Sequence, residues 1–438
     1  MKRWGKCTGT SDNGRPASQT DFYHDNCHDE MKVESLCQPV TECRDVSGRV
    51  SPLLIIVVAA LSVSLPLAAA ILPEDRTDAF YHRYDGGGVT VDGPALLARK
   101  QVGQNVSVLA EVYEDSVTSA SIDVVTTASP YTDKRDEKRL GLDYLHGNTT
   151  MNLTFINSVE SDYAADTYHF SASHDMFGDL TTVTLGYGVG HDDVGQNIGG
   201  TRHDKGKTDH HKYSLGVSQI LTKNLVVSST LELDADEGFL NNPYREVLVL
   251  KRDLSGAVIP GDSGFLQLER YPGTRTSNAL GVVAKYYLPY RAALSLGYRT
   301  YSDTWDVQAS MYEIGYTHPL QNHWTFDFSF RSYSQTQASF YADYFYASEM
   351  PYYHARFKDL STYGDNTVGI GLKYEFGRQG FWIFDKGSVS LNYSHIQFDF
   401  LNFTDQRPDP VTNALPLANG KPYSFSADVL RFFVSVWY

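Results

Sequence analysis

Hydrophobic and polar residues alternate along most of the chain beyond residue 100. In TTVTLGYGVG (181–190), Val183, Leu185, Tyr187 and Val189 occupy every second position, with threonine or glycine between them. HWTFDFSFRS (323–332) and NTVGIGLKYEF (366–376) repeat the pattern. Successive side chains of a β-strand point to opposite faces, so each segment predicts a strand with one apolar face and one polar or small face.

The alternation predicts about fourteen strands, each with an apolar face of roughly 9–11 residues, which is the length that a membrane-crossing strand needs. The predicted strands are 105–114, 137–146, 149–159, 165–174, 180–190, 211–221, 224–235, 276–288, 291–302, 307–318, 323–334, 364–376, 387–400 and 424–438.

The connections between these strands alternate in length. Turns at 146–149, 222–223 and 289–290 are short, whereas the connections at 191–210 and 236–275 are long and polar. Outer-membrane barrels place short turns in the periplasm and long loops outside the cell. The sequence therefore predicts an all-β fold, a transmembrane up-and-down antiparallel β-barrel over 105–438, with 12 or 16 strands as alternatives to 14.

The C-terminal stretch LRFFVSVWY (430–438) agrees with a strand in lipid. Leu430, Phe432, Val434, Val436 and Tyr438 form one apolar face, while Arg431 and Ser435 fall on the other. A terminal aromatic residue preceded by apolar residues at every second position resembles the assembly signal of bacterial outer-membrane proteins. The expected location is the bacterial outer membrane, and the expected partners are its lipids and the barrel assembly machinery. We assign the signal to Phe432, Val434, Val436 and Tyr438.

Residues 1–70 are expected to be a leader that is removed. The long apolar run SPLLIIVVAALSVSLPLAAAILPEDR, from Ser51 to Arg76, is broken by Pro66 and contains Ala68–Ala69–Ala70, a small-residue pattern typical of signal-peptidase sites. An uncleaved anchor helix is the alternative interpretation. The 50 residues before the run are long for a signal peptide, so the start codon is open to reassignment, with Met31 as a candidate. All four cysteines lie before residue 44 and match no metal-binding spacing, and the body without thiols suits export.

The segment 71–104 precedes the first predicted strand and contains three consecutive glycines, Gly86 to Gly88. One hypothesis is a hatch folded into the barrel, similar to the N-terminal plug of long-chain fatty acid transporters. The alternatives are a periplasmic tail or an extra strand.

Several stretches resemble one family closely: DAFYHRYDGGGVTVDGPALLARK (78–100), SVTSASIDVVTTASPY (116–131), DEGFLNNPYR (236–245), YPGTRTSNAL (271–280) and YYLPYRAAL (286–294). They are similar to the segments that mark the uncharacterised bacterial outer-membrane family called domain of unknown function 3570. The resemblance covers residues 75–438 and implies a signal peptide and a barrel, but no established reaction.

Charged residues of both signs are predicted on the inward faces of the strands. They can line an aqueous pore or pair into a network that closes the barrel. The predicted lumen-lining residues are Glu111, Asp143, Glu232, Lys285, Arg299, Glu313, Asp327, Arg331, Lys373, Glu375 and Arg431.

Two hypotheses on function remain. The first is a channel or selective transporter of small solutes, whose identity the sequence does not define. The second is a closed structural or binding barrel that displays its loops without transport. Glycine and serine at inward positions leave room in the lumen and favour the first. The net charge of −15 argues against nucleic acid as a partner.

No cofactor or enzymatic activity is predicted. Ser394 and His395 are adjacent in a strand, so they point to opposite faces and do not form a nucleophile–base pair. The weak metal candidates His191, His203, His210 and His211 match no structural zinc spacing, and an exposed polar loop explains them as well. We therefore predict no metal.

Overall fold

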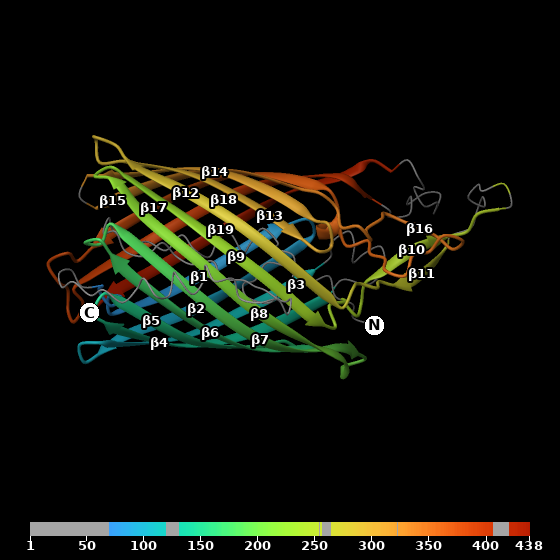
Figure 1. Cartoon of the computed structure of the whole chain (residues 1–438), viewed down its shortest axis with the longest axis horizontal. Helices are drawn as coiled ribbons and strands as arrows, with labels where there is room; N and C mark the ends of the chain where they lie inside the picture. Colours follow the sequence, from blue (N-terminus) through green and yellow to red (C-terminus); the bar gives the residue numbers. More distant parts are fainter. Residues whose placement is uncertain (1–69, 120–130, 254, 256–263, 322, 406–419) are drawn as a thin grey trace.

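A closed antiparallel β-barrel dominates the structure, a computed structural model (Figure 1). The structure describes residues 70–119, 131–253, 255, 264–321, 323–405 and 420–438. Sixteen strands of these residues form the barrel in the order β1-β19-β18-β17-β15-β14-β13-β12-β9-β8-β7-β6-β5-β4-β3-β2. Among the described residues, no helix has the length and hydrophobicity needed to cross a membrane.

The barrel strands are joined in chain order, and every pair is antiparallel. Their bounds are β1 Arg76–Gly86, β2 Val89–Val102, β3 Val106–Ser119, β4 Tyr131–His146, β5 Thr149–Val159, β6 Tyr163–Met176, β7 Thr181–Ile198, β8 Thr201–Thr222, β9 Leu225–Gly238, β12 Thr274–Tyr287, β13 Ala293–Asp303, β14 Gln308–Leu320, β15 Trp324–Gln335, β17 Tyr363–Phe376, β18 Lys386–Thr404 and β19 Pro422–Trp437.

The fold class is confirmed, with sixteen barrel strands in place of fourteen. All fourteen predicted segments overlap barrel strands, and the two further strands, β1 and β2, come from 71–104. The hatch hypothesis for that segment is therefore wrong, and the extra-strand alternative is nearer the observed fold. The expected leader, 1–70, lies outside the described residues except for Ala70.

The segment 71–104 forms barrel strands because β1 is needed to close the barrel. β1 pairs with β19 from Arg76↔Trp437 to Gly86↔Ala427, and it pairs with β2 on its other side. Without β1, β19 would present unpaired backbone groups to hydrocarbon, at a cost of several kcal/mol each. Gly87 and Gly88, at φ 58° and 78°, make the tight turn between β1 and β2.

Over the middle of most strands, the exposed face is apolar and the buried face is polar or small, as the alternation predicts. On β17, Val368, Ile370 and Leu372 point outward with exposures of 45%, 50% and 43%, whereas the inward Thr367 and Lys373 are 2% and 6% exposed. Outward aromatic pairs such as Trp324–Tyr374 and Tyr187–Tyr213 contact each other, with ring centroids 4.7 and 5.0 Å apart. An apolar belt with aromatic residues near its borders is typical of a barrel in a membrane.

The two ends of the barrel differ. The turn end holds the start of β1, the end of β19 and short turns such as those between β8 and β9 and between β12 and β13. Here the backbone N–H of Tyr438 donates to the carbonyl of Asp75 at 3.2 Å. The opposite, loop end holds the connection between β9 and β12 and the connection between β15 and β17.

At the loop end, the expected long loop at 191–210 is instead a hairpin. β7 and β8 continue for 18 and 22 residues and meet at Gly199 and Gly200, whose φ values of 61° and 88° suit a two-residue turn. The predicted loop at 236–275 contains β10 (Glu246–Leu250) and β11 (Phe265–Leu268). These strands form a small sheet with β16 (Phe345–Tyr346) beyond the barrel, on the right of Figure 1. A short 3-10 turn, η3 (Lys358–Leu360), precedes β17.

The terminal strand has the predicted faces. Leu430 and Phe432 point outward with exposures of 38% and 40%, while Arg431 points inward. The ring of the inward Phe433 stacks on the ring of Phe80 of β1, with centroids 4.4 Å apart. This contact stabilises the β1–β19 pairing that closes the barrel.

Candidate functional site

The inner wall of the barrel is the candidate site. The eleven residues predicted to line the lumen all occupy inward positions of their strands. That they border an aqueous path stays a prediction. The sequence did not predict which of these side chains contact each other, because contacts between strands depend on the register of the strands.

Several of these charges form ion pairs in the structure. Arg299 on β13 donates through Nη1 to Oε1 of Glu232 on β9 at 3.1 Å. Arg331 donates to Asp365 on the neighbouring β17, with Nη2 and Oδ1 2.9 Å apart. The arginines are held by carboxylates at fixed positions, so the inner wall is charged and also rigid.

Other predicted lumen residues have partners on the same strand or on nearby strands. Glu111 lies 3.5 Å from Arg139, and Asp143 lies 3.3 Å from Arg99. Lys373 lies 2.9 Å from Glu375 on the same strand, and the hydroxyl of Thr317 donates to Asp327 at 2.6 Å. Lys285 is inward but exposed, Glu313 is partly buried on β14, and Arg431 is partly buried on β19.

Sequence reasoning missed a second group of inward charges, closer to the loop end. Asp115 on β3 lies 3.0 Å from Nε2 of His82 and 3.4 Å from Nε of Arg135, and Arg135 also contacts Glu137 at 3.4 Å. Asp115, Arg135 and Glu137 are almost fully buried. Residues 115–136 were predicted to be a loop, and the strands β3 and β4 in fact extend into it. Residues 113–119 carry polar side chains on both faces, so hydrophobic alternation gave no signal that the strand continues.

The four predicted histidines do not converge on one site. His210 points inward and lies between Asp192 and Asp236, 2.8 Å from a carboxylate oxygen of each. His191 is exposed beside Asp209 at 2.6 Å, and His203 is exposed near the hairpin turn. His211 is on the outward face, where its Nδ1 lies 3.0 Å from the hydroxyl of Tyr187. Alternation along β8 separates neighbours 210 and 211, so the histidines form no shared ligand set.

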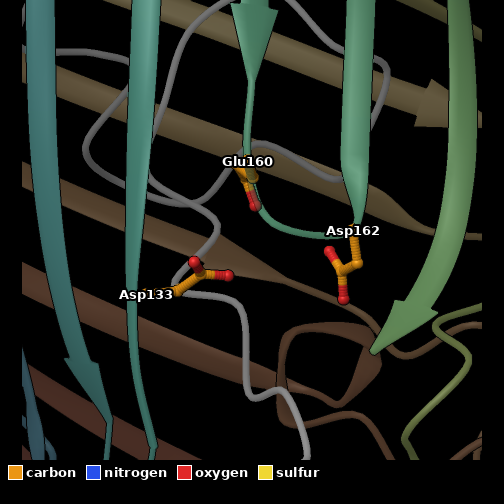
Figure 2. A group of neighbouring side chains, drawn as sticks. All are labelled: Asp133, Glu160 and Asp162. Atoms are coloured by element: carbon orange, nitrogen blue, oxygen red, sulfur yellow. The ribbon is translucent and has the colours of Figure 1, made fainter. Parts of the chain in front are cut away.

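A carboxylate trio lies at the loop end where β4 starts and where β5 turns into β6 (Figure 2). One oxygen of each of Asp133, Glu160 and Asp162 lies within 4.8 Å of the others. Oxygen-only ligands suit calcium or magnesium. The trio is also tied into its surroundings: Ser161 donates to Asp133 at 3.0 Å, and Tyr244 donates to Asp162. Burial and the Asp162 carboxylate raise the pKa of Tyr244. The trio concentrates negative charge at the loop end of the wall.

Asp303 organises the turn between β13 and β14. Its Oδ2 accepts from Nε and Nη2 of Arg275 at 2.8 and 2.5 Å, and its Oδ1 accepts from the backbone N–H groups of Trp305 and Val307 at 2.9 and 3.0 Å. The side chain of Asp303 is fully buried, and that of Arg275 is 5% exposed. The guanidinium of Arg275 also lies over the ring of Trp305.

The fold and the two faces define the class of protein as a closed antiparallel β-barrel of the outer-membrane type. Residues 122–386 match the family described as "Protein of unknown function (DUF3570)". The match covers more than half of the chain, so the protein belongs to this family, as its loop segments predicted. No curated protein matches the sequence.

Several solved outer-membrane proteins align with the chain at low sequence identity. A bacterial polysaccharide outer membrane secretin aligns with a TM-score of 0.45 and 7% identity over 84% of this chain and 100% of that one. The siderophore receptor PirA from Acinetobacter baumannii has a TM-score of 0.39 and 9% identity over 84% and 60%. OpdQ from Pseudomonas aeruginosa has a TM-score of 0.38 and 9% identity over 83% and 98%. At these scores the likenesses carry no information on function.

Proposed function

We propose that the protein is a channel or selective transporter for small solutes in the bacterial outer membrane. The observation that carries this proposal is the closed sixteen-strand barrel, with an apolar outer belt and a polar inner wall. Barrels of 16 to 18 strands are wide enough to leave an aqueous channel. The inward glycines Gly369 and Gly371 of β17 are buried, and the space beside them is occupied by side chains of the neighbouring strands, including Ser329 and Asn392.

A closed structural or binding barrel is the second candidate. The observation that favours it is the burial of the inward charges near the loop end, where Asp115, Asp236 and Arg275 are 1%, 4% and 4% exposed. Tight packing of such groups excludes water from that part of the wall. The two candidates differ in whether ions cross the lumen.

The test is conductance of the purified, refolded protein in a planar lipid bilayer. The channel proposal predicts discrete conductance steps that depend on protein insertion. A heat-denatured sample of the same preparation is the control. Insertion without any steps, verified by protease protection of the barrel in liposomes, would contradict the channel and favour the closed barrel.

We propose no enzymatic activity and no cofactor. Ser394 is inward and buried, whereas His395 is outward and lies 2.8 Å from Asp428, so this adjacent pair does not form a nucleophile with its base. A screen of the purified protein with ester and phospholipid substrates tests the proposal, and turnover above that of the heat-denatured protein would contradict it.

We propose outer-membrane lipids and the barrel assembly machinery as partners. The outward residues of β19 support this, because they place the terminal signal at the β1–β19 closure. Deletion of Tyr438 should leave refolding in detergent nearly unchanged, since this residue lies at the rim of the belt, but should reduce assembly in cells severalfold. Heat-modifiable migration on gels measures folding, and outer-membrane fractionation measures assembly. Wild-type amounts of the deletion variant in the outer membrane would overturn the signal assignment.

A further inference from the structure

The segment between β15 and β17, residues 336–362, packs apolar side chains from both sides of β16 against inward residues of the wall at the loop end, while β16 itself lies in the sheet beyond the barrel. Phe340, Tyr341, Phe357 and Leu360 are buried with exposures of 8%, 4%, 6% and 0%. They belong to one hydrophobic cluster that also contains inward residues of the wall. Burial of four large side chains in a connection between barrel strands is unlike a solvated loop, whose apolar residues would stay exposed to water.

The wall side of this cluster covers neighbouring strands. Ile396, Phe398 and Phe400 of β18 alternate with outward residues and point inward, and Val429 of β19 lies beside them. Partly buried aromatic residues on β1, β13 and β15 pack against the same cluster: Tyr84, Tyr301 and Tyr333. In the barrel order, β1-β19-β18-β17-β15-β14-β13 are consecutive, so the cluster spans seven of the sixteen strands at the loop end.

Polar contacts fasten the segment to the wall and to the connection between β9 and β12. The backbone N–H of Arg356 donates to Oε1 of Glu269 at 2.6 Å, and its Nη2 donates to the carbonyl of Thr404 on β18 at 2.8 Å. The N–H of Thr362 donates to Oδ1 of Asn402 at 2.8 Å. Arg356 and Glu269 are buried, so these contacts are shielded from water and from salt.

The remaining part of the wall has a different character. On β3, β4, β7, β8 and β9, inward positions near the loop end carry Asp115, Arg135, Asp192, His210 and Asp236. These side chains are charged or polar, and none belongs to the aromatic cluster. The loop end thus has a large aromatic cluster, covered by residues 336–362, on one side, and buried charged groups beside a smaller apolar cluster of Tyr163, Ala165 and Val194 on the other.

We propose that residues 336–362 are the constriction of the barrel, which sets the largest hydrophilic solute that crosses it. This inference rests on the proposed channel function. The segment covers the β13-to-β1 side of the mouth and so narrows the opening. Its position comes from the aromatic cluster and the Arg356 contacts, so weakening them widens the mouth.

The test is replacement of residues 337–361 by an Asn-Gly turn. Gln335 of β15 pairs with Tyr363 of β17, and the N–H of Gln337 donates to the hydroxyl of Thr362 at 3.0 Å, so a short turn can join the strands. We expect single-channel conductance to rise about twofold or more, because nearly half of the mouth is uncovered. Proteoliposomes should also swell in larger oligosaccharides than those that the parent protein admits.

A second variant keeps the length of the chain. Phe340→Asp with Phe357→Asp places two charges in the cluster and should expel the segment, with the same direction of change. Tyr352→Asp is the matched control, because Tyr352 lies in the same segment but is 62% exposed and outside the cluster. It should leave conductance and the size limit unchanged.

The outcomes separate the two proposals. Conductance steps in the parent protein, with an unchanged size limit in both folded variants, would overturn the constriction and leave the channel. A silent parent with a conducting turn variant supports the constriction as a complete plug. Silence of the parent and of both variants, all shown to be folded by heat-modifiable migration, would overturn the channel function and the constriction together.

Discussion

Replacement of Arg275 by methionine should lower the free energy of unfolding by about 3–5 kcal/mol, because it leaves Asp303 charged, fully buried and without its cationic partner. Asp303 accepts two hydrogen bonds from Arg275, and both are lost in the variant. The backbone donors Trp305 and Val307 remain, but they do not neutralise the charge. The variant should therefore unfold at a clearly lower urea concentration in detergent micelles, followed by tryptophan fluorescence.

A matched control comes from an exposed ion pair. Arg83 and Asp85 lie 2.7 Å apart with side chains 46% and 55% exposed, so Arg83→Met should leave stability nearly unchanged. Addition of Asp303→Asn to the Arg275→Met background should recover part of the loss, because an amide carries no net charge to bury. Equal urea midpoints for Arg275→Met and Arg83→Met would contradict the claim that the buried Arg275–Asp303 pair stabilises the fold.

Introduction of arginine at Ile370 should lower the free energy of unfolding in a lipid bilayer by about 2–4 kcal/mol. The reason is that a charged side chain near the bilayer midplane of a barrel is surrounded by hydrocarbon and loses its hydration. Ile370 is 50% exposed on the outward face of β17, between the outward Val368 and Leu372 in the middle of the apolar belt. Urea-dependent refolding into phospholipid vesicles measures the loss.

Asn366→Arg is the control on the same face of the same strand. Asn366 is polar and exposed at the loop end of β17, so arginine there should cost about 0–1 kcal/mol. The ratio of the stability losses of Ile370→Arg and Asn366→Arg reports how deep Ile370 lies in the membrane. Similar costs at both positions would mean that the β17 face does not cross a bilayer.

The period-two pattern of residues such as Val368, Ile370 and Leu372 was enough to predict the barrel and the orientation of its faces. β1 was missed because its outward positions include Thr77, Arg83 and Asp85, so its apolar alternation is weak. Its strand identity comes from pairing with β19 and β2, which are far apart in the chain. The pattern of residues within β1 does not show that this segment pairs with β19.

For the candidate site, the inward orientation of the residues was predictable from the sequence, but their contacts were not. Alternation alone placed Glu232 and Arg299 inward, but their ion pair depends on the register of β9, β12 and β13, in which Glu232 lies opposite Ala279. The aromatic cluster was hidden for another reason. Phe340 and Phe357 lie in an irregular connection without periodicity, so only tertiary packing shows that they turn inward.

The most direct test of the membrane-spanning barrel is labelling of single cysteines on intact cells with an impermeant maleimide, in a background without the four native cysteines. Ser348→Cys reports the loop end, in the exposed connection between β15 and β17, and Lys223→Cys reports the turn end, between β8 and β9. A barrel in the outer membrane with its loops outside predicts labelling of Ser348→Cys on intact cells, and labelling of Lys223→Cys only after the cells are lysed. Labelling of both cysteines on intact cells, or protection of both until lysis, would contradict a barrel that crosses the outer membrane, and labelling of Lys223→Cys alone would contradict the orientation.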